Sequence, residues 1–265
     1  MDTVVDRLIR YAKVYSESDY HAGRTVTPST DRQFDMAKLL VEELHGLGIE
    51  NARYDDKCYV YATLDATPGC EQLPAIGLIA HMDTTPDMTG KDVKPQIIHY
   101  TGGDVVLNRE QNIVMEAAQF PELQKFVGQE LVCTDGTTLL GADDKAGIAI
   151  ILQAVEELLA EKAPHGKICL GFTPDEEIGM GASFFDVSGF GAGFANGEIF
   201  KTQHNGCAVI NHGFHSQTAA PGYAMCYAWG IRHLEGDPWD KTRIDDPEHA
   251  WLWKADANDH IYPNH

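Results

Sequence analysis

Apolar residues recur at three- and four-residue spacing in two N-terminal stretches, the spacing of an amphipathic helix. The first stretch follows Asp2, which can cap it. The second begins after Ser29 or Thr30, either of which can serve as its cap, and it ends at Gly46 and Gly48. These patterns predict two helices packed on a core through one face each.

Short apolar runs follow, and they predict strands over residues 59–64, 76–80 and 168–172. A strongly helical stretch over 145–159 precedes the last of them. Helices that alternate with short apolar strands indicate an α/β fold, a mixed sheet flanked by helices on both faces. Sites in such sheets gather beyond the carboxyl ends of the strands.

Three acidic or histidine-bearing motifs fall at these positions. Residues 79–83 read Ile-Ala-His-Met-Asp, residues 141–145 read Gly-Ala-Asp-Asp-Lys, and residues 174–177 read Pro-Asp-Glu-Glu. Together they supply one imidazole and several carboxylates, the ligand types of a hydrolytic zinc site with a general base. The sequence therefore predicts that three loops converge at one edge of the sheet.

Each residue type has a chemical reason to be there. His81 can ligate zinc, and Asp83 is placed to accept the other ring proton of His81. Asp143 is the candidate for a carboxylate that bridges two metal ions. Glu176 and Glu177 can divide two duties, since one can ligate while the other takes a proton from water.

Structural interpretations compete with this one. A histidine after a strand can be purely structural, an Asp-Asp pair before a helix can be an N-cap, and a Glu-Glu pair can belong to a solvated loop. Motif spacing alone leaves the metal site and these alternatives open.

Composition narrows the function class. The net charge of −20 over 265 residues excludes the basic face that a nucleic-acid partner requires. No apolar run approaches the length of a membrane span, and the first residues lack the pattern of a signal peptide. The six cysteines are scattered without a paired motif, which favours free thiols and a cytoplasmic location. Cys133 and Cys169 lie in apolar runs and are expected in the core.

Longer segments carry a resemblance to a known family. Residues 74–84, 135–149, 164–166 and 172–179 resemble peptidase T, the tripeptide aminopeptidases of the zinc-dependent M20 peptidases. The resemblance covers residues 1–195 and implies a catalytic zinc-peptidase domain there. It also implies removal of the N-terminal residue from tripeptides, with two zinc ions per subunit.

The resemblance implies a role for each site residue. His81 would ligate one zinc ion, Asp143 would bridge both, and Glu177 would ligate the second. Glu176 would be the general base, and Asp83 would support His81. Other M20 activities, such as a dipeptidase, a carboxypeptidase or a deacylase, share these core motifs and remain alternatives.

The resemblance ends near Ala195, and residues 196–265 form an aberrant tail of uncertain fold. Ile199 stands where the family has a metal-binding aspartate, and no histidine-bearing lid segment or final histidine ligand follows. We therefore expect an incomplete core without its lid (dimerisation) domain, and no homodimer. Two hypotheses on activity follow: a tripeptide aminopeptidase, and an inactive or nearly inactive remnant of such an enzyme. The tail holds seven histidines without compact ligand spacing, and it holds every tryptophan: Trp229, Trp239, Trp251 and Trp253.

Out-of-frame translation is one hypothesis for the tail. Residues 220–223 read Ala-Pro-Gly-Tyr, and codons for them exist whose next frame encodes His-Pro-Gly-Thr, a segment that opens the family's lid domain. The coding DNA tests the hypothesis, because a next frame without a lid-domain sequence would exclude it.

Overall fold

The computed structural model describes residues 2–192, 194–196 and 208–210. Its body is a six-stranded sheet in the order β1-β2-β8-β3-β9-β10. The strands are β1 (Arg53–Tyr54), β2 (Val60–Leu64), β3 (Ile76–His81), β8 (Ile168–Thr173), β9 (Phe194–Asn196) and β10 (Ala208–Ile210). β1, β2 and β8 pair antiparallel, whereas β8, β3, β9 and β10 run parallel. The predicted mixed sheet is confirmed.

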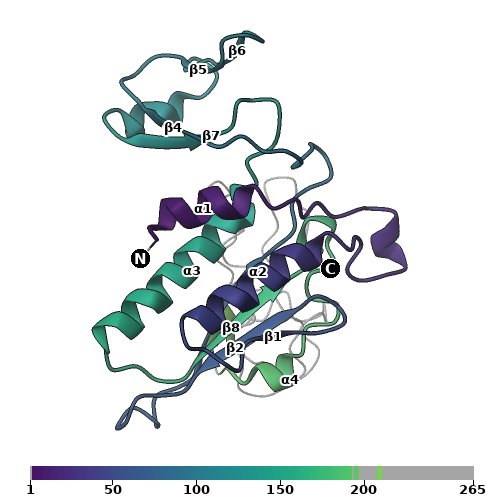
Figure 1. Cartoon of the computed structure of the whole chain (residues 1–265), viewed down its shortest axis with the longest axis vertical. Coiled ribbons are helices and arrows are strands. Elements are labelled where there is room, and N and C mark those ends of the chain that lie inside the picture. Colours follow the sequence, from purple (N-terminus) through teal and green to yellow (C-terminus); the bar gives the residue numbers. More distant parts are fainter. Residues whose placement is uncertain (1, 193, 197–207, 211–265) are drawn as a thin grey trace, which may run out of the picture.

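Three helices cover one face of this sheet (Figure 1). They are α1 (Val4–Ala12), α2 (Gln33–Gly46) and α3 (Ala142–Glu161). Even-numbered residues of β2 and β8, from Val60 to Phe172, pack with them in the main core. Because side chains alternate along a strand, the odd-numbered neighbours Tyr59, Tyr61 and Cys169 face the other way.

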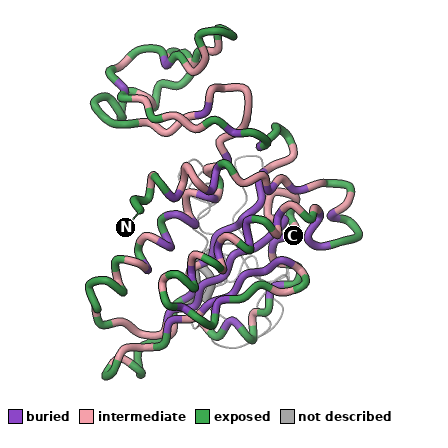
Figure 2. The backbone as a smooth tube through the Cα atoms, viewed as in Figure 1, coloured by how far each residue is buried: buried purple, intermediate pink, exposed green. Residues whose placement is uncertain are grey.

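A smaller aromatic core closes the opposite face. Phe185 and Phe190 lie against Tyr59 and Tyr61, with α4 (Val187–Phe190) carrying the second phenylalanine. The tyrosine hydroxyls also accept backbone N–H groups, Phe184 to Tyr59 at 3.2 Å and Asp186 to Tyr61 at 2.9 Å. Elements therefore cover both faces, as the α/β prediction requires, and buried backbone runs through the strands in Figure 2.

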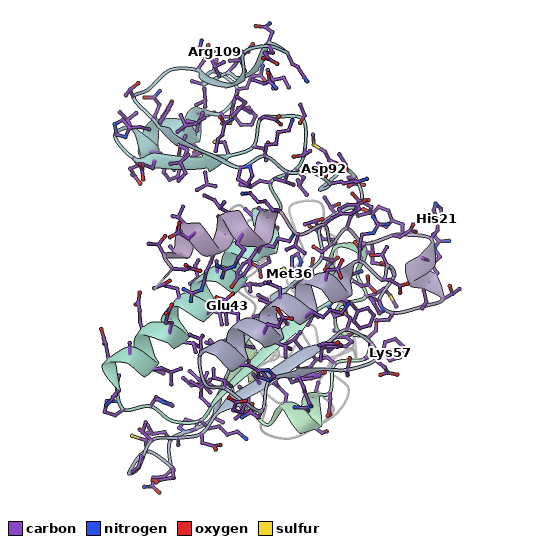
Figure 3. The ribbon with its side chains drawn as sticks, in the orientation of Figure 1. His21, Met36, Glu43, Lys57, Asp92 and Arg109 are labelled. Carbon is purple, nitrogen blue, oxygen red and sulfur yellow. The ribbon has the colours of Figure 1, made fainter. Side chains whose placement is uncertain are left out.

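A lobe that the sequence did not predict stands apart from this body (Figure 1). It contains two antiparallel strand pairs and a short 3-10 helix. Figure 3 marks Arg109 in the lobe and Asp92 nearer the body. The elements are β4 (Gln96–His99) paired with β7 (Glu130–Cys133), β5 (Val105–Asn108) paired with β6 (Ile113–Met115), and η2 (Pro121–Phe126). Most of its residues are exposed, so the apolar periodicity that reveals a core strand is absent.

Both predicted helix caps are wrong. Thr3, not Asp2, caps α1 through a capping box with Asp6, while Asp2 pairs with Arg10. α2 begins at Gln33 without a side-chain cap, because the Ser29 hydroxyl bonds Asp175 and the Thr30 hydroxyl bonds the Glu17 carbonyl. The end of α2 at Gly46 is confirmed.

Two expectations on the cysteines have different outcomes. Cys169 is fully buried, as predicted, whereas Cys133 is only half-buried because it lies in the lobe strand β7. The four cysteines among the described residues are free. No helix in the described part of the chain is long and apolar enough to cross a membrane.

The expectations for the C-terminal part lie mostly outside the described residues. They concern Ile199, the tail histidines and the absence of the lid segment. Residues 208–210, beyond the expected end of the resemblance, form β10 parallel to β9. The sheet therefore continues past residue 195.

Candidate metal centre

Two adjacent parallel strands deliver the site residues to one edge of the sheet. β3 ends at His81 and β8 ends at Thr173, and these two residues are register partners. The N–H of Met82 donates to the Thr173 carbonyl at 2.8 Å, which keeps the two strand ends together. The loops that follow therefore leave the sheet side by side, as the placement of the motifs predicted.

His81 is the centre of this edge. Its ring is buried, and Nε2 lies 3.0 Å from Asp143 Oδ1 and 3.6 Å from Glu176 Oε2. On the other side of the ring, Nδ1 lies 3.1 Å from the Asp83 carbonyl and 3.4 Å from its Oδ1. The structure thus brings three of the predicted motifs together around one imidazole.

Asp83 connects two of these loops. Its carboxylate is fully buried and accepts the backbone N–H of Glu176 at 2.9 Å and of Glu177 at 3.2 Å. The sequence predicted contact with His81 but not this second role. Asp83 therefore fixes the start of η3 (Glu176–Ile178), from which both glutamates project.

The start of α3 supplies the third loop. Asp143 and Asp144 have non-helical backbone angles, so the regular helix begins at Lys145, as predicted. Asp144 Oδ1 accepts the Gly147 N–H at 3.1 Å, an N-cap interaction, while the half-exposed Asp143 side chain faces His81. Asp144 thus fits the N-cap interpretation of the acidic pair, and Asp143 fits the ligand interpretation.

The protonation of the site reflects its crowding. Burial alone would lower the pKa of His81, but hydrogen bonds to Asp143 and Asp83 outweigh it and hold that pKa well above its usual value. Burial, reinforced by the charges of Asp83, Glu176 and Asp143 and opposed by His81, raises the pKa of Glu177 to about 7. Burial likewise raises the pKa of Asp144 to about 6. The charges of His81, Asp83, Asp143 and Glu176 therefore all affect the pKa of Glu177.

Among the described residues, no group of three or more potential ligand side chains is arranged to hold a metal ion as it stands. The donor set nevertheless fits one. Two ligands about 2.0–2.2 Å from a tetrahedral zinc ion lie roughly 3.3–3.6 Å apart, and His81 Nε2 and Asp143 Oδ1 are 3.0 Å apart. To bind one zinc ion, these two atoms need to move apart by a few tenths of an ångström and to lose the proton that they share.

Sequence reasoning missed three buried side chains that support the site. Asp175 and Gln33 hydrogen-bond each other, and Lys145 donates from Nζ to the Val14 carbonyl at 2.6 Å. Asp175 and Lys145 lie inside two of the recognised motifs, which was the available signal. Nothing in the local pattern separates Gln33 from an ordinary helix residue.

Comparisons with known proteins identify relatives of this chain. The sequence model of peptidase family M20/M25/M40 matches residues 139–217. Peptidase T of Alkaliphilus oremlandii is 49% identical over 225 residues, covering 80% of this chain and 54% of the relative. Peptidase T of Halothermothrix orenii is 53% identical over 197 residues, covering 74% and 48%.

Two solved structures share the fold. Aminopeptidase PepT from Bacillus cereus has a TM-score of 0.50 at 26% identity and covers 73% of this chain and 42% of its own. A tripeptidase from Staphylococcus aureus has a TM-score of 0.51 at 22% identity, with coverage of 78% and 42%. The chain spans about half the length of the curated relatives it matches. Over roughly three quarters of its own length, the chain is thus similar to peptidase T, and residues 139–217 match the model of the M20/M25/M40 peptidases.

Proposed function

We propose that this protein is a zinc-dependent aminopeptidase that releases the N-terminal residue from tripeptides. The observation that carries the proposal is the convergence of Asp143 and Glu176 on the buried ring of His81, at 3.0 and 3.6 Å. The similarity to peptidase T and to a structure named a tripeptidase supports the substrate class. Free cysteines among the described residues support a cytoplasmic location.

We assign one role to each residue. His81 would hold one zinc ion through Nε2, since Asp83 takes up Nδ1. Asp143 would contribute its carboxylate to both ions, and Glu177 would hold the second. Bound zinc would supply a Lewis acid for the peptide carbonyl and would lower the pKa of water. Glu176 accepts the proton of the attacking water and then passes it to the leaving amine.

Two arguments together give the role of general base to Glu176 and not to Glu177. They are the geometry and the resemblance to peptidase T. Glu176 Oε2 is within 3.6 Å of His81, so it could also ligate. Both glutamates leave a loop that Asp83 holds through their N–H groups.

A substrate panel with added zinc tests the proposal. We expect release of the first residue from free tripeptides and no cleavage of the same peptides with a blocked N-terminus. Glu176→Gln should abolish turnover yet retain zinc, whereas Glu177→Gln should lose zinc. Cleavage of N-blocked peptides would contradict the aminopeptidase assignment and favour a carboxypeptidase or deacylase of the same family. A chain that neither binds zinc nor cleaves any peptide would contradict the whole proposal.

A further inference from the structure

Asp175, the residue before the catalytic glutamates, is tied to the start of α2. Its carboxylate is fully buried. Oδ2 accepts the Ser29 N–H at 2.7 Å, and Oδ1 accepts the Ser29 hydroxyl at 2.5 Å and Gln33 Nε2 at 2.7 Å. The Asp175 N–H donates in turn to Gln33 Oε1 at 3.1 Å. Four hydrogen bonds therefore join one residue of the site loop to two residues more than 140 positions away in the chain.

These bonds compensate a costly arrangement. A buried carboxylate is destabilising unless hydrogen bonds replace its water. The Asp175 backbone is also unusual, with φ of 57° in the left-handed region that L residues rarely adopt. Gln33, itself fully buried, bonds both the main chain and the side chain of Asp175. The pair thus holds a conformation that an isolated loop would leave.

The left-handed turn has a consequence for the next two residues. After it, the N–H groups of Glu176 and Glu177 both point to the Asp83 carboxylate, at 2.9 and 3.2 Å. The loop is therefore anchored twice, to β3 through Asp83 and to α2 through Asp175. Neither anchor alone fixes both the position and the direction of the glutamate side chains.

We propose that Ser29, Gln33 and Asp175, called the clasp here, are positioning residues that set the place of Glu176 and Glu177 relative to His81. The inference deepens the proposed peptidase function, and its metal readout rests on that function. Misplacement of a reacting group by about 1 Å can cost roughly a hundredfold in rate. Through the clasp, the first turn of α2 helps to position the side chains of a site that it does not contact.

Two variants break the clasp in different ways. Gln33→Met keeps the length of the side chain and removes both of its hydrogen bonds to Asp175. Ser29→Ala removes one hydroxyl and leaves Gln33 in place, so it tests the inference even where Gln33→Met does not fold. Gln96→Met is the matched control, because Gln96 also joins two segments, donating to the carbonyls of Leu107 and Thr134 at 3.0 and 2.7 Å, but lies in the lobe.

Amide hydrogen exchange in the full chain is the first readout and needs no metal. We expect the Glu176 and Glu177 amides to exchange at least about tenfold faster in both clasp variants, relative to the amides of β8. Gln96→Met should leave this ratio unchanged. Unchanged exchange at the two glutamates in a folded clasp variant would overturn the proposal, because their N–H groups would then be held without the clasp.

Zinc affinity, measured by competition with a chromophoric chelator, is the second readout. Loss of a residue that orients ligands typically weakens metal binding about 10- to 100-fold, and we expect this for both clasp variants but not for Gln96→Met. Equal affinity in all four proteins would overturn the positioning role. Faster exchange in the clasp variants, together with no zinc binding by the unmodified chain, would uphold the clasp and contradict the peptidase function instead.

Discussion

The Asp83 carboxylate accepts the backbone N–H of Glu176 at 2.9 Å, and this bond joins the loop after β3 to the loop after β8. Asp83 is fully buried and also approaches His81 Nδ1 at 3.4 Å. One carboxylate therefore orients the imidazole and places the glutamates.

Replacing Asp83 should therefore affect metal binding and stability together. In Asp83→Asn, an NH₂ group replaces one oxygen, so one donor among His81 and the two glutamate amides loses its acceptor. A buried donor without a partner costs about 1–3 kcal/mol, and zinc affinity should fall about 10- to 100-fold. Urea unfolding and zinc competition measure the two effects. Unchanged zinc affinity would show that Asp83 does not orient the ligands.

The cap of α3 predicts that replacement by alanine has different effects on stability at two helix glycines. An added Cβ at Gly147 would lie 2.2 Å from Asp144 Oδ1, whereas at Gly46 nothing lies within 4 Å. Gly46→Ala should stabilise by up to about 1 kcal/mol through helix propensity. Gly147→Ala has the same gain in helix propensity, but it displaces the Asp144 cap, and the loss of the cap offsets that gain. We expect a difference of about 1 kcal/mol in the free energy of unfolding, and equal stabilisation would exclude the cap.

Zinc binding should release protons near neutral pH. His81 has a pKa well above its usual value and Glu177 has a pKa of about 7, so the metal-free site holds protons that ligation must displace. Affinity should therefore rise with pH from 6 to 8. Calorimetry in two buffers with different ionisation enthalpies measures the released protons. Binding without proton release, or affinity that falls with rising pH, contradicts the proposed ligands.

Lys145 should give the unfolding free energy a characteristic pH dependence. Burial, partly opposed by Asp83, lowers its pKa from 10.5 to about 8. The folded state then binds fewer protons than the unfolded state between these values, so stability from this residue rises as pH increases from 8 to 10.5. Lys145→Met should remove this contribution. The difference in stability between the two proteins, measured by denaturation at several pH values, must shift in favour of the unmodified chain as pH rises.

The sequence predicted the parts of the fold that bury apolar surface. The strand ending at His81 and the strand 168–172 were found because both faces of each are covered, which produces continuous apolar runs. The convergence of the motifs at 81 and 176 followed from the carboxyl ends of two parallel strands, and Asp143 joins them from the start of α3. Nothing comparable marks the lobe strands, in which every side chain except Val105 is partly or fully exposed.

The sequence did not predict the long-range polar contacts. Ser29 was read as a helix cap because a hydroxyl before an apolar helix usually bonds the local backbone, but its hydroxyl bonds Asp175 instead. Gln33 shows no local pattern at all. Figure 3 marks a similar case at Glu43 on α2, which bonds Arg7, Arg10 and Tyr11 of α1. Such partners depend on tertiary placement, which a single sequence does not reveal.

The most direct test of the metal centre is the zinc content of three proteins after dialysis against a low zinc concentration. They are the unmodified chain, His81→Ala, and His99→Ala, whose histidine is exposed in the lobe. We predict retained zinc in the unmodified chain and in His99→Ala, and its loss in His81→Ala. Equal zinc content in all three proteins, or none in the unmodified chain, would contradict the assignment of His81 as a metal ligand.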